Sequence, residues 1–392
     1  MAHLWAHHPF KAIYTLYFAP TTALYLVVLS LRYAIRPLRP LREWSYTTSL
    51  GAAVLRYFFE YLTTIRYQQP RQMVPGRCKE RFALIQPPSD TKGPPFFSGV
   101  LAPKVVVPAP VGVVWHPTPV AAPGATNTGS EPSRKKVALV MAGGAFVLGW
   151  DPEDTGRAAS DILTEYFGAT NILYVQYRLA APETPFPAAI QDVLTSYFYV
   201  LSLGVASEDI TLVGDSAGGN LVIAFLRYLE TTATHLPRPG AAMVFSPWVD
   251  VTPGAGNKYE QSAASRLDIL DGQLLEWGVA AYRPTRDKLL AACGSEAETD
   301  ALLRKVEPFI SPLNHPFHSK TPLFIQTGAV EGFFDSIRRF AEQMIDVEGN
   351  KIHFEVSEHM PHDFFLPYPV LGTKKEVKGA LETARRFFDM TV

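Results

Sequence analysis

The sequence carries almost no excess charge of either sign. Its 36 lysine and arginine residues are balanced by 37 aspartate and glutamate residues, which gives a formal net charge of -1. Proteins that bind nucleic acid collect phosphate through a basic surface, and a balanced chain has no global positive field for this purpose. The composition therefore argues against a nucleic-acid partner.

Cysteine is nearly absent as well. Cys78 and Cys293 lie far apart and outside any CxxC or Cys/His ligand spacing. Neither a disulfide framework nor a zinc site is therefore suggested, and both thiols are expected to be ordinary buried side chains. The sequence also lacks a Walker A loop and a dinucleotide fingerprint, so we expect neither a cofactor nor a metal.

One long run of the sequence lacks charge altogether. Ala12 to Leu31 is uncharged and apolar, and about 20 such residues suffice to cross a hydrocarbon core as a helix. Only Lys11 precedes the run, whereas four arginines follow it: Arg32, Arg36, Arg39 and Arg42. By the positive-inside rule we expect a single-pass membrane protein with its catalytic domain in the cytosol. The alternative is a lid helix in a soluble cytoplasmic protein.

The rest of the chain divides by pattern. Thr47 to Tyr67 has apolar residues at helical spacing, which predicts an amphipathic helix that covers a pocket or lies on a bilayer. Residues 118–136 are rich in Pro, Gly, Ser and Thr, which predicts a loop. We expect three units: an anchor or lid helix in residues 1–45, a lid or connecting region in residues 46–114, and a catalytic domain in residues 115–392.

Short β-rich runs alternate with helical stretches in the predicted catalytic domain. The runs typical of buried strands are residues 137–141, 171–177, 210–214, 241–246, 322–328 and 351–357. Strand and helix alternation of this kind favours a mostly parallel central sheet with helices on its faces. The sequence therefore predicts an α/β fold.

The strongest chemical signal lies after one of these runs. Gly214 to Gly218 reads GDSAG, the G-x-S-x-G nucleophile elbow, between a predicted strand and a predicted helix. A serine on such a sharp turn has strained backbone angles and close neighbours, so small residues are needed two positions before and after it. We predict that Ser216 is a catalytic nucleophile.

A glycine-rich turn occurs earlier in the chain. Ala142 to Phe146 reads AGGAF and follows the predicted strand 137–141. Esterases with a nucleophile elbow place oxyanion-binding N–H groups at this point. We expect the backbone N–H groups of Gly144, Ala145 and Ala217 to form the oxyanion hole.

These segments together resemble the hormone-sensitive-lipase family of α/β-hydrolases. That family has HGGGF before the elbow, YRLAPE-x-PFPAA between, and GDSAGGN at the elbow; Tyr177 to Ala189 reads YRLAAPETPFPAA here. The resemblance extends from Trp115 to the C-terminus and is strongest to fungal members, which share the WHP element at Trp115–Pro117. Ala142 replaces the family's histidine, and Ala145 replaces its third glycine. The resemblance implies an α/β-hydrolase fold and serine esterase activity.

The base is expected late in the chain, in the order Ser, Asp/Glu, His. His362 follows the predicted strand 351–357, in a segment that resembles the family's His-Gly-Phe loop with Asp363 in place of the glycine. We predict that His362 is the catalytic base, with His359 as the competitor.

The acid is expected after the predicted strand 322–328. Its loop aligns with the family's Asp-Pro-Leu-x-Asp, which places Glu331 at the catalytic position and Asp335 at the second acidic one. Either carboxylate can orient His362 and stabilise its imidazolium form. We favour Glu331, and Asp335 stays as the alternative.

We interpret the chain as a serine carboxylic-ester hydrolase for a lipophilic small-molecule ester, because aromatic residues and an apolar lid are available. Similar fungal proteins include sterol-acetate esterases and hydrolases of secondary-metabolite biosynthesis. Two alternatives are a cyclase or acyltransferase on the same Ser/His pair, and a catalytically dead ligand-binding receptor. The presence of His362 argues against the receptor.

Overall fold

The computed structural model describes residues 4–88, 96–120 and 135–391 of the chain. Within these residues the strands form one eight-stranded sheet with the order β1-β2-β4-β3-β5-β6-β7-β8. The strands are β1 (Phe82–Ile85), β2 (Val111–His116), β3 (Val137–Met141), β4 (Asn171–Gln176), β5 (Ile210–Asp215), β6 (Ala241–Phe245), β7 (Leu323–Gly328) and β8 (Ile352–Ser357). The predicted loop 118–136 lies mostly outside the described residues.

The sheet is parallel except at one edge. The pairs from β3 and β4 through to β8 are parallel, whereas β2 is antiparallel to both β1 and β4. Strands β3, β4, β6 and β7 are buried along their whole length, as expected for parallel strands covered on both faces. The predicted fold class is confirmed, although the sheet also takes in two strands from the region 46–114.

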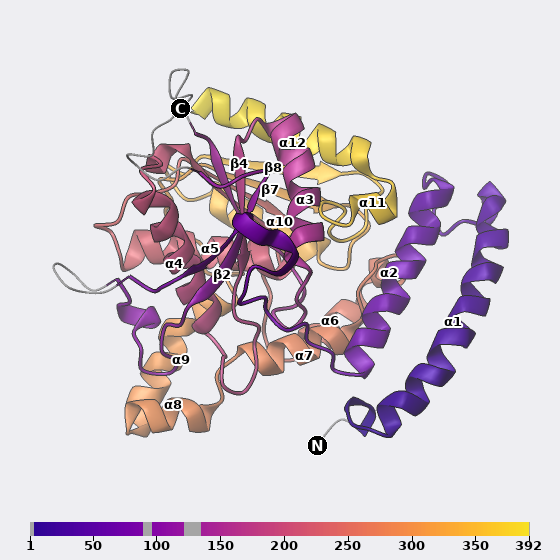
Figure 1. The fold of residues 1–392 in the computed structure, drawn as a ribbon, viewed down its shortest axis with the longest axis horizontal. Coiled ribbons are helices and arrows are strands. Elements are labelled where there is room, and N and C mark those ends of the chain that lie inside the picture. Colours follow the sequence, from indigo (N-terminus) through magenta and orange to yellow (C-terminus); the bar gives the residue numbers. More distant parts are fainter. Residues whose placement is uncertain (1–3, 89–95, 121–134, 392) are drawn as a thin grey trace.

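Helices cover both faces of the sheet (Figure 1). The described helices are α1 (Phe10–Ala34), α2 (Tyr46–Thr64), α3 (Pro152–Ile162), α4 (Ala188–Ser202), α5 (Ser216–Thr231), α6 (Ala255–Gln261), α7 (Gly272–Tyr282), α8 (Arg286–Cys293), α9 (Glu296–Ile310), α10 (Phe334–Ile345), α11 (Tyr368–Leu371) and α12 (Lys374–Thr391). Helices α3 and α12 lie on one side of the sheet, and α4 and α5 lie on the other.

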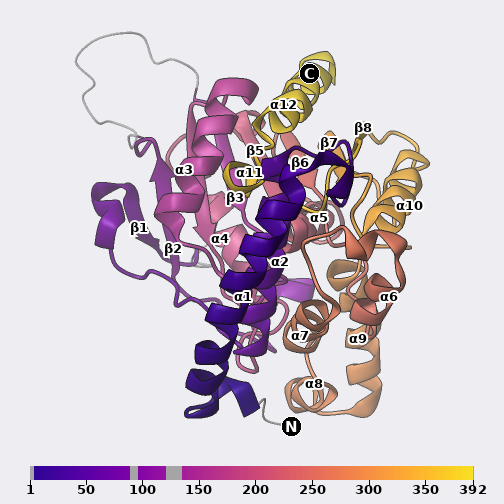
Figure 2. The same cartoon turned by 90° about the vertical axis from the view of Figure 1, so that its right-hand side faces the viewer.

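Helices α1 and α2 form an antiparallel hairpin at the side of the molecule (Figures 1 and 2). Helix α2 packs against α7 and α11. Its approach to α11 is so close that a Cβ atom at Gly51 would lie 2.3 Å from the carbonyl oxygen of Val370. Helix α1 contacts the rest of the molecule mainly through α2. Along α1, Leu29 and Tyr33 are the buried side chains of the helix as described.

Candidate active site

Ser216 is the first residue of α5 and directly follows β5. Its backbone has a φ of 48°, in the left-handed region that side chains other than glycine rarely adopt. The neighbouring glycines allow this turn, because a Cβ atom at Gly214 would lie 2.4 Å from the Gly218 carbonyl oxygen and one at Gly218 would lie 1.9 Å from that of Met141. The tight approach of strand and helix therefore requires both glycines.

His362 and Glu331 lie side by side. Glu331 Oε2 is 2.8 Å from His362 Nδ1, and both side chains are buried. The other oxygen of Glu331 accepts hydrogen bonds from the Thr327 hydroxyl and from the Gly328 backbone N–H, the latter at 3.2 Å. This carboxylate is therefore fixed at the end of β7 and can hold the Nδ1 proton of the imidazole.

The surroundings of His362 act on its pKa in opposite directions. Burial lowers the pKa of the imidazole, whereas the hydrogen bond and negative charge of Glu331 raise it. The charges of Asp268 and Asp215 add to the raising effects, and the resulting pKa lies above the ordinary value for histidine. The site therefore stabilises the imidazolium that forms when His362 accepts a proton.

The two competing residues lie elsewhere. Asp335 is in the first turn of α10, with its side chain 89% exposed and 3.7 Å from Arg338. His359 is exposed, and its carbonyl oxygen accepts a hydrogen bond from the indole of Trp44. Neither side chain lines the pocket that contains Ser216 and His362.

The predicted oxyanion turn borders the same pocket. Gly144 and Ala145 line it together with Ser216, while Ala217 is the next residue of α5. Ala145 has a φ of 51°, so its methyl group is held in the left-handed region at a cost of about 1 kcal/mol. The three N–H groups stay predicted donors.

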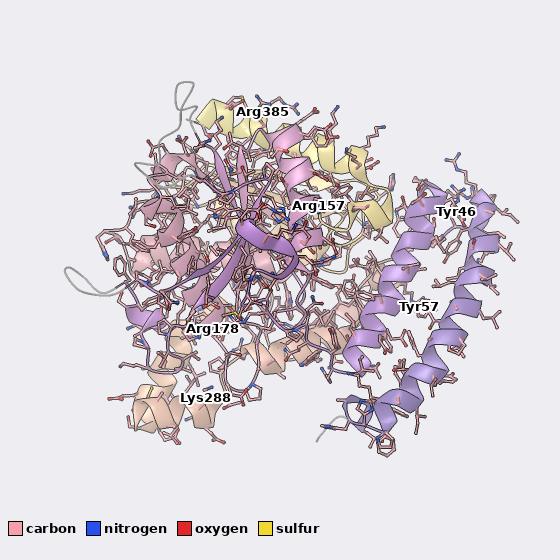
Figure 3. The ribbon with its side chains drawn as sticks, in the orientation of Figure 1. Tyr46, Tyr57, Arg157, Arg178, Lys288 and Arg385 are labelled. Atoms are coloured by element: carbon pink, nitrogen blue, oxygen red, sulfur yellow. The ribbon has the colours of Figure 1, made fainter. Side chains whose placement is uncertain are left out.

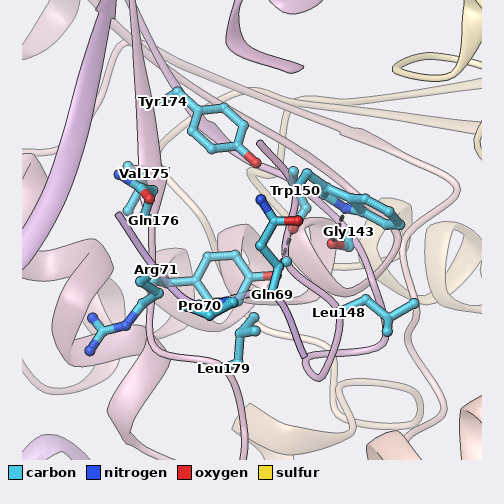
Figure 4. A pocket seen from close by; sticks show the side chains of 13 residues that line it. Gln69, Pro70, Arg71, Gly143, Leu148, Trp150, Tyr174, Val175, Gln176 and Leu179 are labelled. Atoms are coloured by element: carbon cyan, nitrogen blue, oxygen red, sulfur yellow. Dashed lines mark hydrogen bonds between the residues drawn. The ribbon is translucent and has the colours of Figure 1, made fainter. Parts of the chain in front are cut away.

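Hydrogen bonds from two side chains outside the turn, whose roles the sequence analysis did not predict, hold the turn in place. The Tyr177 hydroxyl donates to the Ala142 carbonyl oxygen at 2.6 Å. The Trp150 indole donates to the Gly143 carbonyl oxygen at 3.0 Å, and Figure 4 shows these two residues. On the other side, Gly143 N–H donates to Asp215 Oδ2 at 2.8 Å. Tyr177 and Trp150 also line a second cavity of about 30 Å³ next to the turn, which is too small for an organic substrate.

Asp268 is another residue that the sequence reasoning missed. Its Oδ1 accepts the backbone N–H of His362 at 2.8 Å, and its Oδ2 accepts that of Gly332 at 2.7 Å. One buried carboxylate thus joins the loop of the base to the loop of the acid. No local signal marks it, because both partners are distant in sequence.

The pocket in front of Ser216 has a volume of about 290 Å³. Its apolar wall comes from α2, α7 and α11 and includes Leu55, Phe58, Phe59, Leu274, Leu275 and Val370. The polar residues that line the pocket are Ser216, His362, Asp215, Asp363, Asp154 and Thr155. An apolar chamber with a few polar groups suits a small lipophilic molecule.

Comparison with known proteins agrees with this geometry. Residues 138–366 match a family described as the alpha/beta hydrolase fold. The chain is 32% identical over 250 residues to an acetyl-hydrolase from Streptomyces hygroscopicus. This alignment covers 64% of this chain and 74% of that protein. It is 31% identical over 124 residues to a Schizosaccharomyces pombe protein that is named, provisionally, a steryl acetyl hydrolase. This alignment covers 31% of this chain and 32% of the yeast protein.

A solved structure extends the likeness to nearly the full chain. An esterase of the bacterial hormone-sensitive lipase family superposes with a TM-score of 0.54 over 94% of this chain and 99% of that chain, at 23% identity. At this identity the match shows the fold.

Proposed function

Since this chain belongs to the α/β-hydrolase family and is similar to its hormone-sensitive-lipase branch, we propose that it is a serine carboxylic-ester hydrolase acting on a lipophilic small-molecule ester. One observation carries the proposal. Glu331 lies 2.8 Å from His362, and His362 lines the same pocket as Ser216, which is on its strained turn. This supplies the three groups of a serine triad in one place.

In the proposed mechanism the Ser216 hydroxyl gives its proton to His362 Nε2 while its oxygen attacks the ester carbonyl carbon. Glu331 stabilises the positive imidazolium, and the N–H groups of Gly144, Ala145 and Ala217 stabilise the oxyanion. The alcohol leaves with the proton from His362 and an acyl-serine remains. Water then attacks this acyl group with His362 again as base, which releases the carboxylic acid and restores Ser216.

The chemistry of the pocket limits the substrate class. Its wall is apolar and its volume is about 290 Å³, so a compact hydrophobic alcohol or acyl part fits better than a charged one. The acetyl-hydrolase name of the bacterial relative and the steryl name of the yeast relative favour acetate esters of a hydrophobic alcohol. A sterol acetate or an acetylated secondary metabolite has this chemistry.

We also propose that α1 holds the protein at a membrane, with the catalytic domain on the cytosolic side. The helix is 25 residues long, is apolar enough to enter a bilayer, and has only 6% of its most apolar window buried in the fold. Its free face carries large apolar side chains such as Leu16, Leu24 and Leu31, and a soluble surface rarely exposes so large a patch.

A panel of esters tests the proposed reaction. Acetate and longer acyl esters of short and hydrophobic alcohols would be incubated with the native chain and with Ser216→Ala, and the products would be identified by mass spectrometry. We expect free acid and alcohol, in amounts that require Ser216. Formation of cyclised or acyl-transferred products without free acid would favour the cyclase or acyltransferase alternative.

A further inference from the structure

Hydrogen bonds join α1 to α2 near both ends of the hairpin. Near one end the Thr15 and Tyr61 hydroxyls are 2.9 Å apart, and near the other end the Ser30 and Tyr46 hydroxyls are 2.6 Å apart. Figure 3 shows Tyr46 and Tyr57 on α2, beside α1. The spacing of the two helices is therefore fixed by contacts at the ends.

Between these hydrogen bonds the rings of Tyr25 and Tyr57 also meet, with centroids 5.5 Å apart, but the interface next to Tyr57 is only partly filled. A groove of about 440 Å³ lies between the helices. On α1 the small residues Ala19, Thr22 and Ala23 line it, and they leave space opposite the aromatic rings of Tyr57 and Phe58 on α2. The groove exists because small side chains stand where larger ones would fill the interface.

The groove and the active-site pocket share a wall. Phe58 lines both of them, and its side chain is 43% exposed. Its neighbour Leu55 faces the pocket with Ser216, and Val54 faces the groove. Phe58 is the residue that borders both spaces, and its ring also lies beside the rings of Phe59 and Trp150.

We propose that the groove between α1 and α2 is the entry path and binding site for the hydrocarbon part of a bilayer-dissolved ester, which passes Phe58 to reach Ser216. This inference rests on the proposed esterase function and on the proposed insertion of α1. The groove lies along α1, which carries no charge between Lys11 and Arg32, so with α1 in a bilayer an ester dissolved in the acyl chains would meet the groove without crossing water. The substrate class is an ester with a long or rigid hydrocarbon part.

Filling the groove tests the path. Ala23→Trp places an indole among the small residues of α1, and Leu24→Trp, one residue along and 68% exposed outside the groove, is the matched control. Each variant would be assayed in phosphatidylcholine vesicles with cholesteryl acetate and, separately, with water-soluble p-nitrophenyl acetate. We expect Ala23→Trp to lower kcat/KM for the vesicle-held ester about tenfold relative to the soluble ester, because binding energy of the remote part is lost.

The outcomes separate the path from the catalytic proposal. A selective loss in Ala23→Trp with an unchanged ratio in Leu24→Trp supports the groove. An unchanged ratio in Ala23→Trp overturns it, whether both activities stay or both fall, and leaves the esterase function standing if p-nitrophenyl acetate is still hydrolysed through Ser216.

A second, independent observation concerns two acids in the active site. The side chains of Asp215 and Asp363 both border the pocket, and the two buried carboxyl groups lie close enough to act on each other's pKa. One buried oxygen of each, Oδ1, has no hydrogen-bond partner among the described residues. A buried carboxyl oxygen without a donor is unfavourable, and a proton held between the two groups would satisfy both oxygens.

We infer that Asp363 and Asp215 share a proton, and that Asp363 is a positioning residue for the oxyanion turn. Asp215 holds the N–H of Gly143 in that turn, and the proton on Asp363 fixes the orientation of Asp215. The other groups that act on the pair are His362, Glu331 and the N–H of Leu366. Burial raises the pKa of Asp215 to about 6 and, with the charge of Asp215, raises the pKa of Asp363 well above its usual range.

Asp363→Asn and Asp363→Ala test the shared proton. Asn tolerates the φ of 47° found here and its amide can still donate to Asp215, whereas Ala cannot donate. Infrared difference spectra at neutral pH should show the carbonyl band of a protonated carboxylic acid in the native chain and lose it in both variants. We expect kcat to fall more in Asp363→Ala than in Asp363→Asn. A native spectrum without such a band, or equal losses of kcat, would overturn the inference.

Discussion

The active site and the α1–α2 hairpin are held in different ways. Around His362, hydrogen bonds to the carboxylates of Glu331 and Asp268 fix both the side chain and the backbone, and these residues are buried. Helix α1 is held by one partner helix, and most of its surface is exposed. Polar groups with fixed partners suit chemistry, whereas an apolar surface without partners in the fold suits a bilayer.

This difference separates the expected effects of substitutions. Changes among the buried polar groups should act on turnover by large factors, because their partners cannot move. Changes on the free face of α1 should act on where the protein resides and leave the chemical step intact.

The largest effect is expected from the nucleophile and the base. Ser216→Ala and His362→Ala should each lower kcat on the order of 10⁴-fold or more, because members of a triad act as a unit. Steady-state hydrolysis of p-nitrophenyl acetate measures this, with circular dichroism to check folding. Substantial turnover by the folded Ser216→Ala variant would contradict the mechanism.

The next effect concerns the acid. Glu331→Gln should cost about a hundredfold or more in kcat, since the neutral amide cannot offset the imidazolium charge and, if its oxygen keeps the Thr327 and Gly328 hydrogen bonds, turns its NH2 group toward Nδ1. Asp335→Asn should cost much less, because Asp335 is exposed and pairs with Arg338. The reverse ranking would reassign the acid to Asp335. Small losses in both variants would mean that neither carboxylate completes the triad with Ser216 and His362.

The pH dependence gives a smaller, directional effect. His362 must be neutral to accept a proton, and Glu331 raises its pKa, so the acid limb of kcat/KM should lie at higher pH than for an ordinary histidine. Glu331→Gln removes the raising partner while burial still lowers the pKa, so the limb should move to lower pH. A limb that moves to higher pH in this variant would show that another group titrates.

The close packing at the nucleophile elbow should make the free energy of unfolding sensitive to substitution there. A Cβ atom at Gly218 would lie 1.9 Å from the carbonyl oxygen of Met141, so Gly218→Ala should destabilise the fold by about 3 kcal/mol or more. Gly379→Ala on the exposed face of α12 meets no atom within 4 Å and should be neutral or stabilise by up to about 1 kcal/mol. Urea unfolding compares the two, and equal midpoints would contradict the close packing.

The smallest effect on turnover is expected at the hairpin. The native chain should sediment with membranes at high salt, because apolar contacts are not screened. Leu24→Glu with Val28→Glu should release it, since each charge costs about 2.5–3.5 kcal/mol in a bilayer, and Ile345→Glu with Met390→Glu is the exposed control. Recovery of the native chain in the soluble fraction without detergent would favour the lid alternative.

The two regions also differ in what the sequence predicted. The elbow is predictable because its steric needs are local: Gly214 and Gly218 lie within two residues of Ser216. The choice between Glu331 and Asp335 depended on a family alignment, and Glu331 is the carboxylate that contacts His362. Asp268 and the contact of Asp215 with Asp363 join segments distant in the chain, so no sequence pattern could mark them.

The hairpin was predicted only in part. The uncharged run at residues 12–31 and the helical periodicity of residues 47–67 predicted two helices, and the structure contains both as α1 (Phe10–Ala34) and α2 (Tyr46–Thr64). The groove between them depends on how α1 and α2 pair, which their composition does not fix. Strands β1 and β2 were missed because they are short runs in a region that we expected to be a connection.

The most direct test of the catalytic proposal is covalent labelling of the nucleophile. The native chain would be treated with a fluorophosphonate probe, digested, and mapped by mass spectrometry, with Ser216→Ala treated in parallel. We predict one modified residue, Ser216, and no labelling of the variant. An unlabelled native chain, or a label that persists in Ser216→Ala, would contradict the proposal that Ser216 is an activated nucleophile.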